Sequence, residues 1–200
     1  MYMLTLMQSS ELYEEIGAEE QAILAQLLRL MELKSAKLYL HSHQVANYAV
    51  SIAAKMRLPR TELEHIRIAS MLHDIGHLTV PTAILAKMPY LSKRELSVYK
   101  GHCNAGSCML ENIPSCQELV PYIRFHHERF DGKGYPKRLK GVNIPLGARI
   151  IAVANDYDRN INPCTENWAK TKEAAIKELN DQSGTAFDPE VVRAFIEALG

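Results

Sequence analysis

The stretch Met71-Leu72-His73-Asp74-Ile75-Gly76-His77 places two metal-binding side chains next to each other. An apolar run over residues 66–72 leads into it, and Gly76 follows closely enough for the backbone to turn away. The pattern therefore predicts a helix that ends at His73 and Asp74. Because a neutral imidazole suits a transition-type divalent cation and a carboxylate can bridge two cations, this pair could begin a two-metal hydrolytic site.

The composition indicates one soluble domain. Of the 200 residues, 47% are hydrophobic and 23% are charged, which suffices for a core without disulfides or a structural metal. Lysine plus arginine equals aspartate plus glutamate at 23 each, so the chain lacks the positive field expected for binding long nucleic acid. Neither an apolar span of about 18 residues nor a signal-peptide pattern occurs, so we expect a cytoplasmic protein without membrane association.

The four cysteines are Cys103, Cys108, Cys116 and Cys164. They contain no Cys-x-x-Cys pair, which leaves a zinc-ribbon or thioredoxin-like interpretation without support. We therefore expect reduced, structural thiols.

A first helix is predicted over residues 16–33, where apolar residues recur every three to four positions behind several glutamates. It could pack on the domain or form the end of a connector to a sensory module. Its apolar stripe could equally form a homodimer contact.

Further apolar periodicity predicts helices around most of the histidines. Residues 41–56 form one helix with His41 on its apolar face and His43 pointing elsewhere. Thr61 and Glu64 read as a capping box that opens the helix leading into the His-Asp pair. Ser92 caps a predicted helix over residues 92–110.

The C-terminal half continues the helical pattern. A helix over residues 119–127 ends in His126-His127, and residues 128–147 read as a loop rich in glycine and lysine. The period of the apolar run over residues 148–157 fits a strand or a buried helix, and Ala152 and Ala154 favour the helix. Helices are also predicted over residues 166–179 and 189–199. Because no alternating segment of strand length occurs, the predicted fold class is all-α.

Five of the eight histidines fall at helix positions that we expect to face one interior: His41, His73, His102, His126 and His127. A lone histidine is usually an ordinary core or surface residue, but five together with Asp74 could complete two adjacent coordination spheres.

These segments resemble the HD-GYP domain family. The motifs that carry the resemblance are His73-Asp74-Ile75-Gly76, Val80-Pro81, Lys100-Gly101-His102, the run from His126 to Pro136, Ile144-Pro145, Ala148-Arg149-Ile150 and Phe187-Asp188-Pro189. The similarity extends from about His41 to Val192. It implies an HD-superfamily helical bundle with a long Gly/Lys-rich loop after the His-His pair. We accordingly divide the chain into an N-terminal helix, residues 1–35, and an HD-GYP-like domain, residues 36–200.

The resemblance also implies a cofactor, a substrate and a ligand set. The family's activity is the metal-dependent opening of cyclic di-GMP to a linear dinucleotide or GMP, with iron or manganese. By motif position the ligands are His41, His73, Asp74, His102, His126 and His127, with Asp74 bridging. A metal-bridging hydroxide would be the nucleophile.

The loop supplies two candidate substrate-binding residues. Lys133 would bring a cationic donor to a ligand phosphate. Tyr135 could stack on a base, form a hydrogen bond to the ligand, or support the loop as a buried aromatic. Gly132 and Gly134 permit tight backbone turns.

Four positions depart from the family pattern. His77 replaces a lysine that contacts substrate phosphate, although histidine could still donate a hydrogen bond to the reacting group. Asn155 replaces the last aspartate ligand and brings no negative charge. Lys37 replaces the acidic ligand of members with three metals, so we expect at most two ions. The basic residue that the family places after the Asp158 position for phosphate contact is not recognisable here, and Arg159 is the available substitute.

Three functions therefore remain open. The first is a two-metal cyclic di-GMP phosphodiesterase, with reduced activity because of these departures. The second is a catalytically degenerate domain that acts as a cyclic-dinucleotide sensor or a protein-interaction module. Its partners would be diguanylate-cyclase-type or other signalling proteins. Hydrolysis of another nucleotide or phosphate ester is a third possibility.

Overall fold

The computed structural model describes residues 17–162 and 169–200, and within them the chain is all-α, as predicted. The α-helices are α3 (Ala18–Lys34), α4 (Ala36–Lys55), α5 (Arg60–Leu72), α6 (Thr82–Leu85), α7 (Lys93–Lys100), α8 (His102–Leu110), α9 (Val120–Phe125), α10 (Leu146–Ile161), α11 (Lys172–Asp181) and α12 (Pro189–Leu199). Short 3-10 turns are η1 (Ile75–Thr79), η2 (Pro114–Cys116) and η3 (Gly141–Asn143). None of the described helices is both long and apolar enough to cross a membrane.

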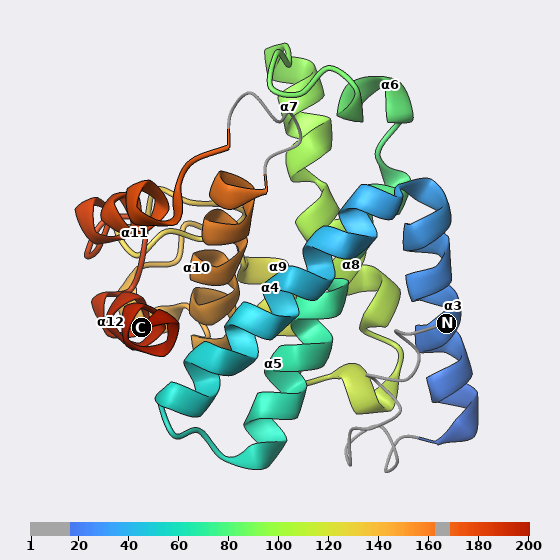
Figure 1. Ribbon diagram of the computed structural model, residues 1–200. Coiled ribbons are helices and arrows are strands. Elements are labelled where there is room, and N and C mark those ends of the chain that lie inside the picture. Colours follow the sequence, from blue (N-terminus) through green and yellow to red (C-terminus); the bar gives the residue numbers. More distant parts are fainter. Residues whose placement is uncertain (1–16, 163–168) are drawn as a thin grey trace.

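Helix α4 is the centre of the bundle. It packs against α5 and α10, with α3 on one side and α12 on the other (Figure 1). Its buried face carries Ala46, Ala49 and Ala53, whose small side chains let the neighbouring helices approach closely. The rings of Tyr48, Tyr157 and Phe195 meet edge to face and join α4, α10 and α12. This packing fixes α10 beside the start of α4.

The predicted N-terminal helix is present as α3. Leu24, Leu28 and Met31 are buried against the rest of the bundle, and α3 contacts both α4 and η1. On the outer face Leu30 and Leu33 are 49% and 68% exposed. The inner face thus has a packing role, whereas the division at residue 35 and the homodimer contact stay predictions.

Two predicted helix starts are wrong. Thr61 does not cap α5, because the extended backbone of Pro59 lets the helix begin at Arg60, two residues earlier than predicted, which leaves Thr61 inside the first turn. The helix predicted from residue 166 begins instead at Lys172, where the hydroxyl of Thr171 accepts a hydrogen bond from the Ala174 N–H. Glu166 lies outside the described residues.

Two predicted helices are shorter than expected. The run over residues 92–110 has the predicted Ser92 cap, but it divides at Gly101 into α7 and α8. The helix predicted over residues 119–127 ends at Phe125. His102 therefore lies at a helix start rather than within a helix, and His126 follows the last residue of α9, at a helix end as predicted.

Gly76 has a different role from the predicted turn. A Cβ atom on Gly76 would lie 1.9 Å from the backbone oxygen of His102 and 2.7 Å from the backbone nitrogen of Gly106. The glycine is thus required for direct contact between the backbones of η1 and α8. This contact brings the His73-Asp74 segment to the start of α8.

The loop after His127 is held by a buried carboxylate. Glu128 accepts hydrogen bonds from the backbone N–H groups of Lys137, at 2.6 Å, and Leu139, at 3.1 Å. Gly132 has a φ of +81°, and a Cβ atom on Gly134 would lie 2.3 Å from the Arg129 nitrogen. Both glycines are therefore needed for the path of the loop, one for its backbone angle and one for close approach.

Candidate metal centre

Side chains from five segments converge on Asp74. His41 comes from α4, His73 ends α5, His102 begins α8, His126 ends α9 and Asn155 lies on α10. Four of these five residues are buried, and the His41 side chain is 15% exposed. The structure thus brings together the histidines that the sequence predicted to face one interior.

Three of the histidines are oriented in the same way. The Nδ1 atoms of His73, His102 and His126 each lie 2.7 Å from the backbone oxygen three residues earlier, which belongs to Ser70, Tyr99 and Ile123, respectively. These oxygens are in the last turns of helices, where carbonyl groups lack intrahelical donors. Donation from Nδ1–H leaves a lone pair on each Nε2 atom, the arrangement that metal-binding histidines use.

The Oδ2 side of Asp74 faces His73 and His41. Oδ2 lies 3.3 Å from His73 Nε2 and 4.0 Å from His41 Nε2. The second oxygen faces other rings: Oδ1 lies 3.3 Å from His102 Nε2, 3.5 Å from His77 Nε2 and 3.7 Å from His126 Nε2. We call these groups the Oδ2 side and the Oδ1 side. The carboxylate stands between two sets of nitrogen donors, as a bridging ligand must.

The donor set fits metal ions. The Nε2 atoms of His102 and His126 are 3.4 Å apart, although both rings use Nδ1 to donate elsewhere. In addition, buried His73 Nε2 and Asp74 Oδ1 have no hydrogen-bond partner. Facing lone pairs and unpartnered acceptors in a buried site require a cation among them.

The electrostatics agree with this requirement. Burial opposes the charge on Asp74, but His73 and His77 hold the pKa of its carboxyl group well below the usual range. Burial likewise opposes a charge on His102, yet the Asp74 and Cys103 side chains raise its pKa to about 10. Desolvation lowers the pKa of His126 to about 4. The anionic carboxylate thus draws positive charge into the site, as protons or as metal ions.

The Oδ2 side contains a carboxylate that the sequence analysis missed. His41 Nδ1 lies 2.6 Å from Asp158 Oδ2, and His41 Nε2 lies 3.0 Å from Asn155 Oδ1. Asn155 and Asp158 are three residues apart on α10 and share one helix face, which is the signal that could have identified Asp158. Asp156 instead accepts a hydrogen bond from Asn160. Asp158 orients His41, while Asn155 presents its carboxamide to the centre.

Beside His77, the Oδ1 side contains two further residues, His127 and Cys103. His77 stacks on His102 with ring centroids 4.1 Å apart, and its side chain is 4% exposed. The His127 ring lies 4.2 Å from that of His126. Cys103, expected to be structural, is a buried free thiol with its sulfur 3.5 Å from His102 Nε2. Cys164 lies outside the described residues.

The two predicted substrate-binding residues differ in position. Tyr135 stacks on His127, with ring centroids 4.9 Å apart and an interplanar angle of 22°. Lys133 is exposed, and its backbone N–H donates to Asp131. The cation beside Tyr135 is Lys100, whose ammonium nitrogen lies 4.8 Å from the ring centroid. The sequence analysis quoted Lys100 within a motif but gave it no role.

Comparison with known proteins identifies the family. Residues 25–191 match the HD domain family. A cyclic di-GMP phosphodiesterase of Thermotoga maritima is 32% identical over 92% of this chain and 52% of its own length. A cyclic di-GMP phosphodiesterase of Pseudomonas aeruginosa is 35% identical over 96% of this chain and 47% of its own length. The chain thus spans about half the length of these relatives.

A solved structure supports the fold. An HDG"Y"P protein from Bdellovibrio bacteriovorus superimposes with a TM-score of 0.66 at 22% identity, over 80% of this chain and 52% of that chain. The family match covers most of the sequence and includes all the histidines that converge on Asp74. This protein therefore belongs to the HD-domain family.

Proposed function

We propose that this protein is a metal-dependent phosphodiesterase that hydrolyses cyclic di-GMP to the linear dinucleotide or GMP. The observation that carries the proposal is the convergence of imidazole nitrogens on the two oxygens of a buried carboxylate, Asp74. Two divalent ions, iron or manganese, would supply a nucleophile at neutral pH and neutralise charge on the phosphodiester. The names of the two phosphodiesterase relatives support this substrate.

The proposed ligands divide between the two sides of Asp74. His41, His73 and Asn155 would hold one ion, and His102, His126 and His127 would hold the other. Asp74 would be shared by both. His73, His102 and His126 are already fixed by their Nδ1 hydrogen bonds, so little side-chain entropy is lost on binding.

The remaining residues would position the substrate. His77 is buried beside Asp74, and we propose that it donates a hydrogen bond to the reacting phosphate, where the family has a lysine. Tyr135 lies flat on His127, so its role would be to fix that ring and to offer its edge to the ligand. Lys100 and the exposed Lys133 would attract the phosphates by their charge.

A cyclic-dinucleotide sensor is the second candidate, and Asn155 is the observation that favours it. The Asn155 carboxamide reaches the centre but brings no negative charge, so the Oδ2 side should bind its ion less firmly than an all-aspartate site. A weakly held ion would leave nucleotide binding intact while slowing hydrolysis.

One experiment tests both candidates. The metal-free protein is loaded anaerobically with ferrous or manganous ions, the bound metal is counted, and cyclic di-GMP, cyclic di-AMP and 3′3′-cGAMP are followed by chromatography. We expect about two ions per chain and a linear product from cyclic di-GMP. Bound metal and bound nucleotide without product would support the sensor instead. A protein that takes up neither ion and binds no cyclic dinucleotide would contradict both candidates.

A further inference from the structure

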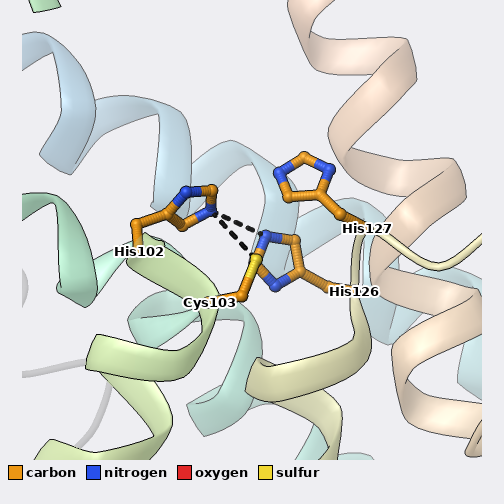
Figure 2. Close-up of side chains that lie close together, drawn as sticks. All are labelled: His102, Cys103, His126 and His127. Carbon is orange, nitrogen blue, oxygen red and sulfur yellow. Dashed lines mark hydrogen bonds between the residues drawn. The ribbon is translucent and has the colours of Figure 1, made fainter. Parts of the chain in front are cut away.

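We infer that Cys103 supplies a thiolate ligand to the Oδ1 side of the centre and makes that side selective for softer metal ions. The ligand atoms of His102, Cys103, His126 and His127 all lie within 4.8 Å of one another. Figure 2 shows the thiol of Cys103 beside the His126 ring, with dashed lines from His102 to the sulfur and to His126, and the His127 ring nearby. The inference rests on the metal binding that the proposed function requires.

Two separations in the structure match those expected between ligands of one metal ion. For metal–nitrogen bonds near 2.05 Å and a metal–sulfur bond near 2.3 Å, tetrahedral angles place two nitrogens about 3.3 Å apart and nitrogen and sulfur about 3.6 Å apart. The two Nε2 atoms of His102 and His126 are 3.4 Å apart, and Cys103 Sγ is 3.5 Å from His102 Nε2. The sulfur therefore lies where a ligand on the same ion would lie.

The position of Cys103 follows from the turn of α8. His102, Cys103, Gly106, Ser107 and Leu110 form the buried face of this helix, whereas Cys108 is exposed. Cys103 is fully buried, so its thiol has no access to solvent. His102, the residue before Cys103, has its Nε2 atom 3.3 Å from Asp74 Oδ1, which has no hydrogen-bond partner. The His102 nitrogen thus lies within reach of both the carboxylate oxygen and the Cys103 sulfur.

The chemical consequence is a difference in metal preference. Thiolate and imidazole ligands favour zinc, cadmium, cobalt and ferrous ions, while carboxylate and carboxamide oxygens suit manganese. The Oδ1 side would hold a softer ion than the Oδ2 side, where Asn155 contributes oxygen. Metal uptake would remove the S–H proton of Cys103 and release it to solvent.

Cobalt titration reads out this ligand without measuring activity. Cobaltous ions are added anaerobically to the metal-free protein, and the sulfur-to-cobalt charge-transfer band is recorded in the near ultraviolet. We expect the band in the native protein and its loss in Cys103→Ser. The ratio of cadmium to manganese affinity should fall by at least about tenfold in the same variant. Circular dichroism checks that the helices are retained.

The other cysteines provide matched controls. Cys108→Ser removes an exposed thiol from the same helix, and Cys116→Ser removes a buried thiol in η2; both should keep the band. A triple variant, Cys108→Ser/Cys116→Ser/Cys164→Ser, leaves Cys103 alone and should also keep it. If Cys103→Ser does not fold, this triple variant decides, since a missing band there overturns the inference.

The outcomes separate this inference from the proposed function. Cobalt bound without a charge-transfer band, or a band that persists in Cys103→Ser, overturns thiolate ligation and leaves the phosphodiesterase proposal standing. Absence of cobaltous, ferrous and manganous uptake by the native protein overturns both. Loss of the band in Cys103→Ser together with normal cobalt uptake at the Oδ2 side supports the inference, whatever the turnover of cyclic di-GMP.

Discussion

The Oδ2 side of Asp74 is built mainly on long helices, whereas the Oδ1 side is built on helix ends and close backbone contact. His41 and Asn155 project from the interiors of α4 and α10, and Asp158 acts through His41. On the other side His102 and His126 stand at the ends of short helices. The first arrangement depends on how helices pack, and the second on where helices begin and end.

The two sides also differ in chemistry. Besides the shared carboxylate, the Oδ2 side offers imidazoles and a neutral carboxamide oxygen. The Oδ1 side offers imidazoles and a thiol. We therefore expect two metal positions with different affinities and different preferred ions, of which the Oδ2 position is the weaker.

The largest effect is expected from Asp74→Asn, because this residue belongs to both sides. Loss of the bridging charge should remove both ions and lower the hydrolysis of cyclic di-GMP by about 10³-fold or more. Metal analysis and product chromatography measure the two effects. Asp156→Asn is the control, since Asp156 is on α10 but its side chain pairs with Asn160. An Asp74→Asn protein that keeps one ion would show that one side binds independently.

Gly76→Ala should separate the two sides. The added Cβ atom would lie 1.9 Å from the His102 backbone oxygen, so η1 and α8 must move apart. We expect a loss of about 3 kcal/mol in the free energy of unfolding, measured with urea, and loss of the Oδ1 ion before the Oδ2 ion. In Gly17→Ala the added Cβ atom would have no atom within 4 Å. Equal stability of the two variants would contradict the close-contact role of Gly76.

Asn155→Asp should reduce the difference in affinity between the sides. A carboxylate at this position adds a negative charge beside His41, so the affinity of the Oδ2 side for manganese should rise about tenfold. Calorimetric titration can resolve the two binding events. Asn104→Asp, which adds the same charge at an exposed position of α8, tests for a general charge effect. If both variants bind alike, Asn155 is not a ligand.

The smallest effect is expected from Lys133→Ala. This lysine is exposed on the loop, where solvent screens its charge. We expect KM for cyclic di-GMP to rise less than about threefold and kcat to stay unchanged. Lys177→Ala is the control, because Lys177 pairs with Asp181 at the surface. A large fall in kcat would mean that Lys133 reaches the reacting phosphate.

The sequence predicted much of the fold and site because the relevant signals are local. Apolar periodicity identified the helices, and residue type identified the histidines that end them. The helix boundaries predicted from the sequence were wrong at two places. At Gly101 a continuous apolar pattern hides a break between two helices, and at Pro59 a proline takes the capping position expected for Thr61. Periodicity reports which face is buried but not whether the backbone is continuous.

What the sequence by itself determined is the set of donors: five histidines and Asp74, placed by their neighbours at helix ends or on apolar faces. What only the tertiary structure decided is which distant groups meet. His41 contacts Asp158, which is 117 positions away in the sequence. The Cys103 sulfur lies within 4.8 Å of a ring nitrogen of His126. The physical reason is that such contacts depend on the approach of packed helices, which is set by side-chain volumes summed over the whole core and by single close contacts such as Gly76 on His102.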